Sequence, residues 1–351
     1  MKVRARVLKA LFLVVGVAAA SVAAAQAPKV KIMGASATIE AYHGFMFLGV
    51  ALGFYKQLGA EVEFGTVAGS SAAIQLVGAG SAQMAYAGMD ALILAKSKHP
   101  TLPVTAVYLH DRGNIYEIAV PDESPIRSVA MLKDQNVGVA NLASGAIPAI
   151  RAMLSEAGLN PVTGVNLIPV GNGAQAAAAL RAGRVQALSL FRAQHAVIET
   201  LGFKFRYFSR EQPSAVIVVN TDFYKKHPET VAQVLRGIVM GSVFAQVNPN
   251  ATVREHWKMF GKPTGISEAE AIWRGSHVLT GAAKMWKDYR DKSVNWGDMN
   301  KAQWDGMQKF LVEQKLLPAA IPSENLFSTD LIGKVNNPAD AARAEKLAKS
   351  M

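Results

Sequence analysis

Apolar and polar positions along the chain change spacing repeatedly, and these changes predict strands and helices in alternation. Short apolar runs, such as residues 30–34 and 186–191, predict buried strands. Between such runs, apolar positions recur three or four residues apart, so that Ile147 and Ile150 share one face of a helix predicted over residues 146–157. Strands that alternate with helices indicate mostly parallel sheets with helices on both faces, an α/β fold.

Beyond residue 220 the pattern becomes helical. Apolar residues keep helical spacing behind Pro228 and again around Trp304, which predicts a helical C-terminal part. The predicted strands are residues 30–34, 62–64, 83–87, 104–109, 115–120, 136–140, 165–170, 186–191, 205–209 and 216–220, and the predicted helices between them include residues 146–157, 174–182 and 193–200.

The chain starts with a basic stretch that is followed by a short apolar run. Four lysines and arginines, ending at Lys9, precede apolar residues 10–20, and alanine-rich sites follow at residues 23–27. This order is typical of a secretory signal peptide over residues 1–25, cleaved after Ala25 or Ala27. A membrane-anchoring helix is the alternative, but the apolar run is shorter than the ~20 residues that a bilayer requires. We therefore expect a soluble protein in the periplasm.

The amino-acid composition further restricts the class of protein and the kind of ligand. The chain has no cysteine, which excludes a lipoprotein anchor, disulfides, thiolate metal sites and thiol catalysis. The net charge is +11, and without residues 1–25 there remain 33 basic against 26 acidic residues, a net charge of +7. The basic residues are scattered and form no nucleic-acid-binding motif, so a small anionic ligand or a solvated basic surface explains them better.

The length predicts two lobes. The roughly 325 residues that follow the signal peptide exceed one ordinary hydrophobic core. We expect residues 28–112 to form the first part of lobe 1, residues 113–221 to form lobe 2, and residues 222–351 to form the helical C-terminal part. Because no low-complexity linker separates these parts, the chain is expected to cross between the lobes more than once, with hinges near residues 110–116 and 210–222.

Residues 49–88 place a helix, a strand, a second helix and a second strand in a short span, with small residues at each junction. Serines at a helix start can cap free backbone N–H groups, and the same groups can instead turn toward an anion. The junction residues are Gly53, Gly59, Gly69, Ser70, Ser71 and Gly80.

This arrangement resembles the periplasmic solute-binding proteins of ABC importers, in the nitrate/sulfonate/taurine and thiamine-precursor (pyrimidine) binding family. In that family a helix ending G-F-Y/F-x-x-x-G precedes a strand, a G-S turn and a short helix, as it does here from Gly53 to Ser70. The chain departs from the family at Gln83, where an acidic residue is usual. The resemblance covers roughly residues 30–230. It implies a two-lobed periplasmic-binding-protein fold of type II, in which each lobe has a doubly wound, mostly parallel sheet. It also implies that the helical C-terminal part, residues 222–351, returns to lobe 1.

Ligands bind open α/β sheets at the carboxyl ends of the strands, beside helix N-termini. The strand-to-helix junctions of both predicted lobes carry small or hydroxyl residues that admit a ligand to the backbone, although each of them can also be an ordinary turn or helix cap. The candidate ligand-binding residues at these junctions are Ser36, Ala37, Thr38, Gly69, Ser70, Ser71 and Gly88 in lobe 1, and Ser144, Gly145, Gly171, Asn172, Gly173, Phe191 and Arg192 in lobe 2.

Two arginines are candidates for contact with an anionic group. Arg192 directly follows the strand 186–191, where related proteins line the cleft, and its planar fork matches a carboxylate or sulfonate. A surface arginine at a helix start is the alternative. Arg112 follows the strand 104–109, and pairing with Asp111 or another acid is the competing interpretation for it.

Tyr42 and His43 follow the first strand-to-helix turn and are further candidates. Tyr42 can stack on a planar ligand or pack against helices, and His43 can offer a hydrogen bond or a pH-sensitive contact. The other histidines are dispersed, so we expect no metal site, and no G-x-S-x-G elbow supports a nucleophilic serine. We therefore expect no catalytic residue and no cofactor.

Together these features favour a solute-binding component of an ABC importer. It would bind a small organic anion, a sulfonate or carboxylate, by hinge closure and deliver it to a membrane permease. We expect a monomer that is not an enzyme and binds no nucleic acid. A thiamine-precursor pyrimidine is the alternative ligand, and an enzyme of this fold or a periplasmic sensor subunit is the alternative function. The cysteine-rich motif of the family's pyrimidine synthase is absent.

Overall fold

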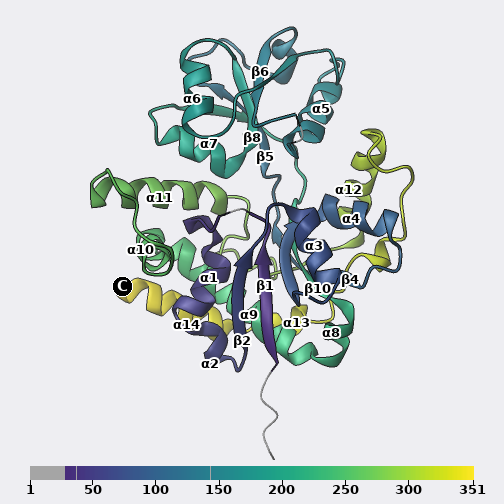
Figure 1. The fold of residues 1–351 in the computed structure, drawn as a ribbon, viewed down its shortest axis with the longest axis vertical. Helices are drawn as coiled ribbons and strands as arrows, with labels where there is room; N and C mark the ends of the chain where they lie inside the picture. The colour runs from purple at the N-terminus through teal and green to yellow at the C-terminus, as the bar shows by residue number, and fades with distance from the viewer. Residues whose placement is uncertain (1–27, 37, 143) are drawn as a thin grey trace, which may run out of the picture.

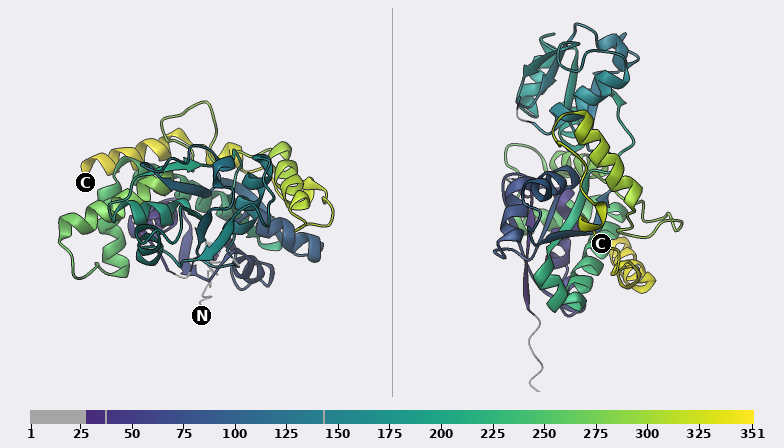
Figure 2. Two further views of the ribbon diagram at one scale, coloured as in Figure 1. Left: turned by 90° about the horizontal axis from the view of Figure 1, so that it is seen from above. Right: turned by 90° about the vertical axis from the view of Figure 1, so that its right-hand side faces the viewer.

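The computed structural model describes residues 28–36, 38–142 and 144–351, which form two lobes, each built around a five-stranded sheet (Figure 1). The predicted signal peptide and its cleavage sites lie outside the described residues, as does Ala37. Figure 2 shows the smaller lobe 2 stacked on lobe 1, which contains all the C-terminal helices. The predicted α/β fold with two lobes is confirmed.

The sheet of lobe 1 has the strand order β2-β1-β3-β10-β4. Strand β1 pairs in parallel with β2 and β3, whereas β10 is antiparallel to both of its neighbours, β3 and β4. The carboxyl ends of the four parallel strands therefore lie at one edge of the sheet. The strands are β1 (Lys29–Gly34), β2 (Glu61–Thr66), β3 (Met84–Gly88), β4 (Val104–Asp111) and β10 (Ala215–Asn220).

Helices cover both faces of this sheet and form two hydrophobic cores. The first core packs α1 and α9 against Ile32 and Ile217 of the sheet, and the second packs α3, α4 and α12 against Met33 and Val216. The helices of lobe 1 are η1 (Ala41–His43), α1 (Gly44–Ala51), α2 (Phe54–Gln57), α3 (Ser70–Gly78), α4 (Met89–Lys98), α8 (Thr221–Lys226), α9 (Pro228–Val247), α10 (Pro249–Phe260), α11 (Glu268–Ala283), α12 (Lys301–Glu313), η3 (Ser323–Asn325), α13 (Ile332–Val335) and α14 (Pro338–Ser350).

The sheet of lobe 2 repeats this topology, with the strand order β7-β6-β8-β5-β9. Here β6 pairs in parallel with β7 and β8, and β5 is antiparallel to β8 and β9. The strands are β5 (Tyr116–Pro121), β6 (Asn136–Val139), β7 (Asn166–Pro169), β8 (Ala187–Phe191) and β9 (Phe205–Phe208), and the helices are η2 (Val129–Leu132), α5 (Ala146–Glu156), α6 (Ala174–Arg181) and α7 (Arg192–Glu199).

The expected end of lobe 2 at residue 221 needs a correction, because strand β10 belongs to lobe 1. All six residues of β10 are buried between β3 and β4 of that sheet. A short apolar run reveals a buried strand but carries no information on which sheet accepts it. The chain therefore crosses from lobe 1 to lobe 2 at residues 112–115 and returns at residues 209–214.

One helix in the described part of the chain, α9, is long and apolar enough to span a membrane. It begins at Pro228, as the sequence predicts, and 78% of its most apolar window is buried. Its residues Val234, Leu235 and Ile238 pack in the first core of lobe 1. The helix is therefore the central core helix of lobe 1.

Candidate functional site

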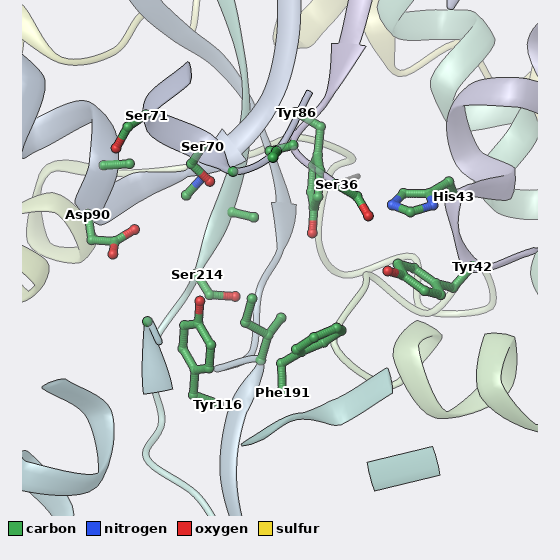
Figure 3. Close-up of a pocket in the computed structure, with 18 residues that line it drawn as sticks. Ser36, Tyr42, His43, Ser70, Ser71, Tyr86, Asp90, Tyr116, Phe191 and Ser214 are labelled. Carbon is green, nitrogen blue, oxygen red and sulfur yellow. The ribbon is translucent and has the colours of Figure 1, made fainter. Parts of the chain in front are cut away.

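A cleft of about 530 Å³ lies between the two lobes at the carboxyl ends of their parallel strands (Figure 3). Lobe 1 contributes most of its wall and lobe 2 contributes the opposite side. The side chains that line the cleft are mainly hydroxyl-bearing and aromatic. From lobe 1 they include Ser36, Tyr42, His43, Ser70, Ser71, Tyr86, Asp90 and Ser214, and from lobe 2 Ile115, Tyr116 and Phe191.

The turn between β1 and α1 places Tyr42 and His43 at one end of the cleft. The Nδ1 atom of His43 accepts a hydrogen bond of 2.9 Å from the backbone N–H of Glu40, so the neutral ring carries its proton on Nε2. Burial lowers the pKa of His43 to about 4 and raises that of Tyr42 to about 12. Both side chains are therefore neutral at physiological pH, and His43 is not a pH-sensitive contact in that range.

The start of α3 forms the middle of the cleft wall. Gly69 has a φ of 91°, a backbone conformation that favours glycine, and it lines the cleft together with the first two residues of α3, whose N–H groups have no partner within the helix. The hydroxyl of Ser70 accepts a hydrogen bond of 2.9 Å from the backbone N–H of Gly88 at the end of β3. This bond fixes two strand-to-helix junctions relative to each other.

Two carboxyl groups lie at or just behind the cleft wall of lobe 1. Asp90 lines the cleft from the first turn of α4, and burial raises the pKa of its carboxyl group. Asp111 lies behind Tyr86, whose hydroxyl donates a hydrogen bond to Oδ2 of Asp111. Burial raises the pKa of Asp111 to about 7, although hydrogen bonds from Tyr86 and Trp286 oppose the shift.

Lobe 2 presents two neighbouring aromatic rings to the cleft. Tyr116 of β5 and Phe191 of β8 are directly opposite each other in the antiparallel ladder, so their side chains lie side by side. Gly145 precedes α5 at the same place, and a Cβ there would clash with the hydroxyl of Tyr116. The glycine therefore allows the start of α5 to approach the ring.

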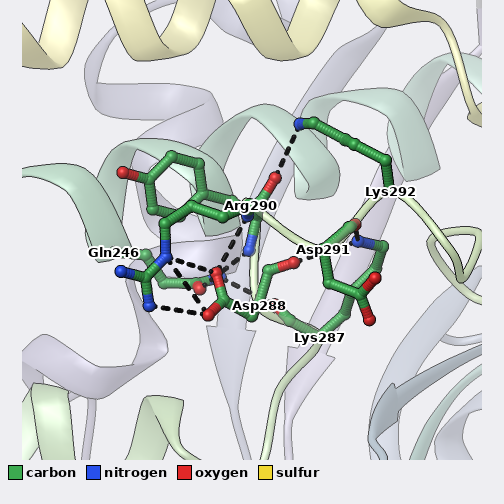
Figure 4. A network of polar contacts seen from close by, with 7 residues as sticks. Gln246, Lys287, Asp288, Arg290, Asp291 and Lys292 are labelled. Carbon is green, nitrogen blue, oxygen red and sulfur yellow. Dashed lines mark hydrogen bonds and ion pairs between the residues drawn. The ribbon is translucent and has the colours of Figure 1, made fainter.

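The first crossing between the lobes is held by a loop that precedes α12. The backbone N–H groups of Arg112 and Gly113 donate to the carbonyl of Met285, at 2.7 and 3.2 Å. The same loop is closed by Lys287, whose Nζ donates to the carbonyls of Asp288 and Asp291, while its own carbonyl accepts from Gln246 (Figure 4). The hinge therefore has a firm anchor in lobe 1.

The structure brings part of the predicted site together. The predicted residues that line the cleft are Ser36, Tyr42, His43, Gly69, Ser70, Ser71, Gly88, Gly145 and Phe191. The other described candidates, Thr38, Ser144, Gly171, Asn172, Gly173 and Arg192, do not line it.

Most of the residues that miss the cleft form local turns and helix starts instead. The hydroxyl of Thr38 donates to Glu40, and that of Ser144 accepts from the backbone N–H of Ala146. Asn172 and Gly173 supply carbonyl acceptors for the first turn of α6. The ordinary turn or cap is therefore the observed role at these positions.

Arg192 is a correction to the predicted site. Its side chain is only 5% exposed and turns away from the cleft, into lobe 2, between Glu117 and Glu199 at 3.7 and 3.4 Å. Its guanidinium carbon lies 4.1 Å from the ring centre of Tyr207. A residue at the start of a helix can point to either side of the preceding strand end, and the buried acids of lobe 2 attract this arginine inward.

Arg112 does not line the cleft either, and it donates a hydrogen bond of 3.0 Å to the carbonyl of Asp298. With both arginines elsewhere, the described residues that line the cleft include no lysine or arginine. Asp90 is the only acidic residue among them. In the described part of the chain, no group of three or more histidine, aspartate or glutamate residues is arranged to hold a metal ion.

Tyr86, Asp90, Tyr116 and Ser214 are cleft residues that the sequence did not single out. A signal existed for Tyr86, because it lies two residues before the predicted Gly88 and so on the same face of the strand. Asp90 was visible as an acid that lies three residues after the end of the predicted strand 83–87. Tyr116 and Ser214 lie next to the crossings, whose positions depend on the tertiary structure.

Two mostly parallel sheets, joined by two crossings around a cleft, define the fold of the two-lobed periplasmic binding proteins. The aliphatic sulphonate binding protein SsuA from Escherichia coli is similar, with 15% identity, a TM-score of 0.65 and coverage of 86% of this chain and 92% of that one. The alkanesulfonate-binding protein SsuA from Xanthomonas axonopodis, bound to MOPS, has 15% identity and a TM-score of 0.60, with coverage of 86% of this chain and 99% of that one. The desulfurization enzyme DszB shares the fold, with 15% identity, a TM-score of 0.55 and coverage of 87% of this chain and 98% of that one.

The family model described as NMT1/THI5 like matches residues 40–252, and the chain belongs to that family. The predicted resemblance is thereby confirmed. No curated protein sequence matches the chain.

Proposed function

We propose that this protein is the solute-binding component of an ABC importer, which captures one small solute between its lobes and presents it to a membrane permease. The observation that carries the proposal is the cleft itself, whose wall combines Ser70 and Tyr86 of lobe 1 with Tyr116 and Phe191 of lobe 2. A solute that contacts both lobes stabilises the closed form by its differential affinity for that form. The protein would act as a monomer in the periplasm.

The two lobes contact each other on both sides of the cleft, so a solute can enter between them at the cleft. On one side α11 of lobe 1 packs against α7 of lobe 2, and Nε2 of His277 lies 2.6 Å from Oε2 of Glu199 (Figure 1). On the other side Met307 and Phe310 of α12 share a hydrophobic cluster with Ala152 of α5. These contacts flank the cleft, and a rotation of lobe 2 about the two crossings would rearrange them.

An enzyme of this fold is the second candidate, because DszB is a structural neighbour. The cleft of this chain favours binding over catalysis. No cysteine is available as a nucleophile. The hydroxyl of Ser70 accepts from Gly88, and that of Ser214 donates to the carbonyl of Gly113 at 2.7 Å, so both are engaged in structural hydrogen bonds. His43, the histidine that lines the cleft, is held by Glu40.

The proposal is tested with the mature chain and a panel of sulfonates, carboxylates, nitrate, pyrimidines and organic amines in a thermal-shift screen. A solute that raises the melting temperature should also reduce the radius of gyration in small-angle X-ray scattering, and mass analysis should recover it unchanged. Ser71→Trp would fill the cleft at the first turn of α3, and Gln75→Trp, one turn further along the same helix and exposed, is the matched control.

We expect the wild type and Gln75→Trp to respond to the solute and Ser71→Trp to fail. Chemical conversion of the solute above a heat-killed control would favour the enzyme instead. Stabilisation without compaction would exclude hinge closure as the mechanism.

A further inference from the structure

Among the described residues, Asp90 is the only acid that lines the cleft, and it has no ion-pair partner there. Its carboxylate accepts hydrogen bonds from its own backbone N–H and that of Ala91. A carboxylate has about four acceptor positions, so capacity remains on the cleft side. A Cβ at Gly88 would clash with Oδ1 of Asp90, and this glycine therefore lets the carboxylate lie over the end of β3, beside Ser70 (Figure 3).

Among the described residues that line the cleft there is an acidic side chain but no cationic one. Arg192 is drawn into lobe 2 and Arg112 into the hinge, which leaves no lysine or arginine among the described lining residues. His43 is neutral, and the second carboxyl group, on Asp111, lies behind Tyr86. An anion at the N-terminus of α3 would thus lie next to the Asp90 carboxylate with no compensating cation, and like charges at such short range repel each other.

Aromatic rings line both sides of the same space. Tyr42 and Tyr86 face it from lobe 1, and Tyr116 and Phe191 face it from lobe 2. Such rings stack on planar ligands and attract cations through their faces. The cleft, about 530 Å³, is in the range of sites that bury a small organic molecule.

We propose that the cleft takes a small arylalkylamine, whose protonated amino group donates a charge-assisted hydrogen bond to Asp90 while its ring packs between the aromatic side chains of the two lobes. This inference rests on the proposed function and names the ligand class of the same site. It replaces the predicted organic anion, which depended on a cation at position 192.

Asp90 also occupies the second position of α4, where an acid stabilises a helix N-terminus regardless of any ligand. Asp222 supplies a matched control, because it occupies the second position of α8 in the same lobe, is exposed and does not line the cleft. A purely helix-stabilising role predicts that Asp90→Asn and Asp222→Asn both leave ligand affinity unchanged.

The test uses three probes of similar size that differ in charge: benzylamine, benzyl alcohol and benzenesulfonate. Calorimetric titration of the wild type should rank benzylamine first and benzenesulfonate last. Asp90→Asn should weaken benzylamine binding about 10- to 150-fold and leave benzyl alcohol nearly unchanged, since a charged hydrogen bond is lost only for the amine. Asp222→Asn should behave like the wild type with all three probes.

The ranking in the wild type needs no variant, so it stays decisive even if Asp90→Asn does not fold. The inference is overturned if benzylamine binds no more tightly than benzenesulfonate, or if folded Asp90→Asn retains full affinity for benzylamine. Tight binding of benzenesulfonate with compaction in scattering would overturn the amine class and leave the solute-binding function standing. Conversion of a bound probe would contradict the solute-binding function, whichever probe binds best.

Discussion

Replacement of Arg192 by alanine should destabilise the protein strongly while ligand affinity stays nearly constant. The guanidinium lies between Glu117 and Glu199 and over the ring of Tyr207, and it packs near Gly281 of α11. The side chain of Arg192 is 5% exposed and that of Glu117 is 7% exposed, so bulk water cannot solvate the acid once the arginine is gone. The variant would leave a buried carboxylate unpaired.

The magnitude follows from that burial. Removal of one partner from a buried ion pair costs about 3–5 kcal/mol, because the remaining charge keeps its desolvation penalty and loses its attraction. His195, fully buried and 3.9 Å from Glu117, cannot replace the arginine easily, since burial lowers its pKa and disfavours the charged ring. With about 2–4 °C per kcal/mol for a domain of this size, the melting temperature should fall by at least about 6 °C.

Thermal and urea unfolding of the wild type and the variant measure this effect. Arg290→Ala is the matched control, because Arg290 pairs with Asp288 on the surface with 74% of its side chain exposed, and surface pairs contribute about 0–1 kcal/mol. Arg192→Ala combined with Glu117→Gln should recover part of the stability, since the unpaired charge is removed. A variant as stable as the wild type, with ligand affinity lowered tenfold or more, would refute the reasoning and return Arg192 to the ligand.

Three further outcomes are expected. Burial raises the pKa of Asp111 from 3.8 to about 7, so the folded state holds this proton more tightly than the unfolded state does. The resulting contribution to the free energy of unfolding is fully present below about pH 4 and is lost as the pH rises through 7. The loss is at most about 1.4 kcal/mol per pH unit. Asp111→Asn should therefore gain stability relative to the wild type between about pH 4 and pH 8 in urea titrations, and parallel curves would contradict this. His277→Gln weakens the contact with Glu199 between the lobes and should lower ligand affinity about two- to fivefold with a larger radius of gyration, whereas unchanged scattering would count against a role in closure. Phe191→Ala should weaken binding of an aromatic solute by about 2- to 10-fold through lost ring stacking, as measured by titration, and equal affinity would place the ligand elsewhere.

The fold was largely predictable, because local patterns carry it. Apolar runs and helical spacing gave strands such as β8 and helices such as α5 within one or two residues of their observed bounds. The placement of β10 was not predictable in this way. Its apolar residues require burial on both faces, and either sheet would satisfy that requirement until the crossings fix which one is near.

The site was predictable only in part, as two adjacent residues show. Phe191 ends strand β8 and faces the cleft as expected, whereas Arg192 begins α7 and turns into lobe 2. The acids that attract Arg192 lie on β5 and at the end of α7, and the helix that packs against it, α11, is about eighty residues further along the chain. Glu199 lies two turns along the same helix and was within reach of local spacing, whereas no spacing near residue 192 indicates Glu117 or α11.

Local patterns of the amino-acid sequence determine the order of strands and helices, the family, and the junctions where a ligand can approach the backbone. Each of these depends on neighbours a few residues apart. The charge of the cleft is decided by the tertiary structure. Burial makes His43 neutral, ion pairs draw Arg192 away, and the end of β3 exposes Asp90 beside Ser70. A chain with a net charge of +11 therefore has a cleft whose described lining residues include one acid and no lysine or arginine, because long-range packing sets where each charge lies.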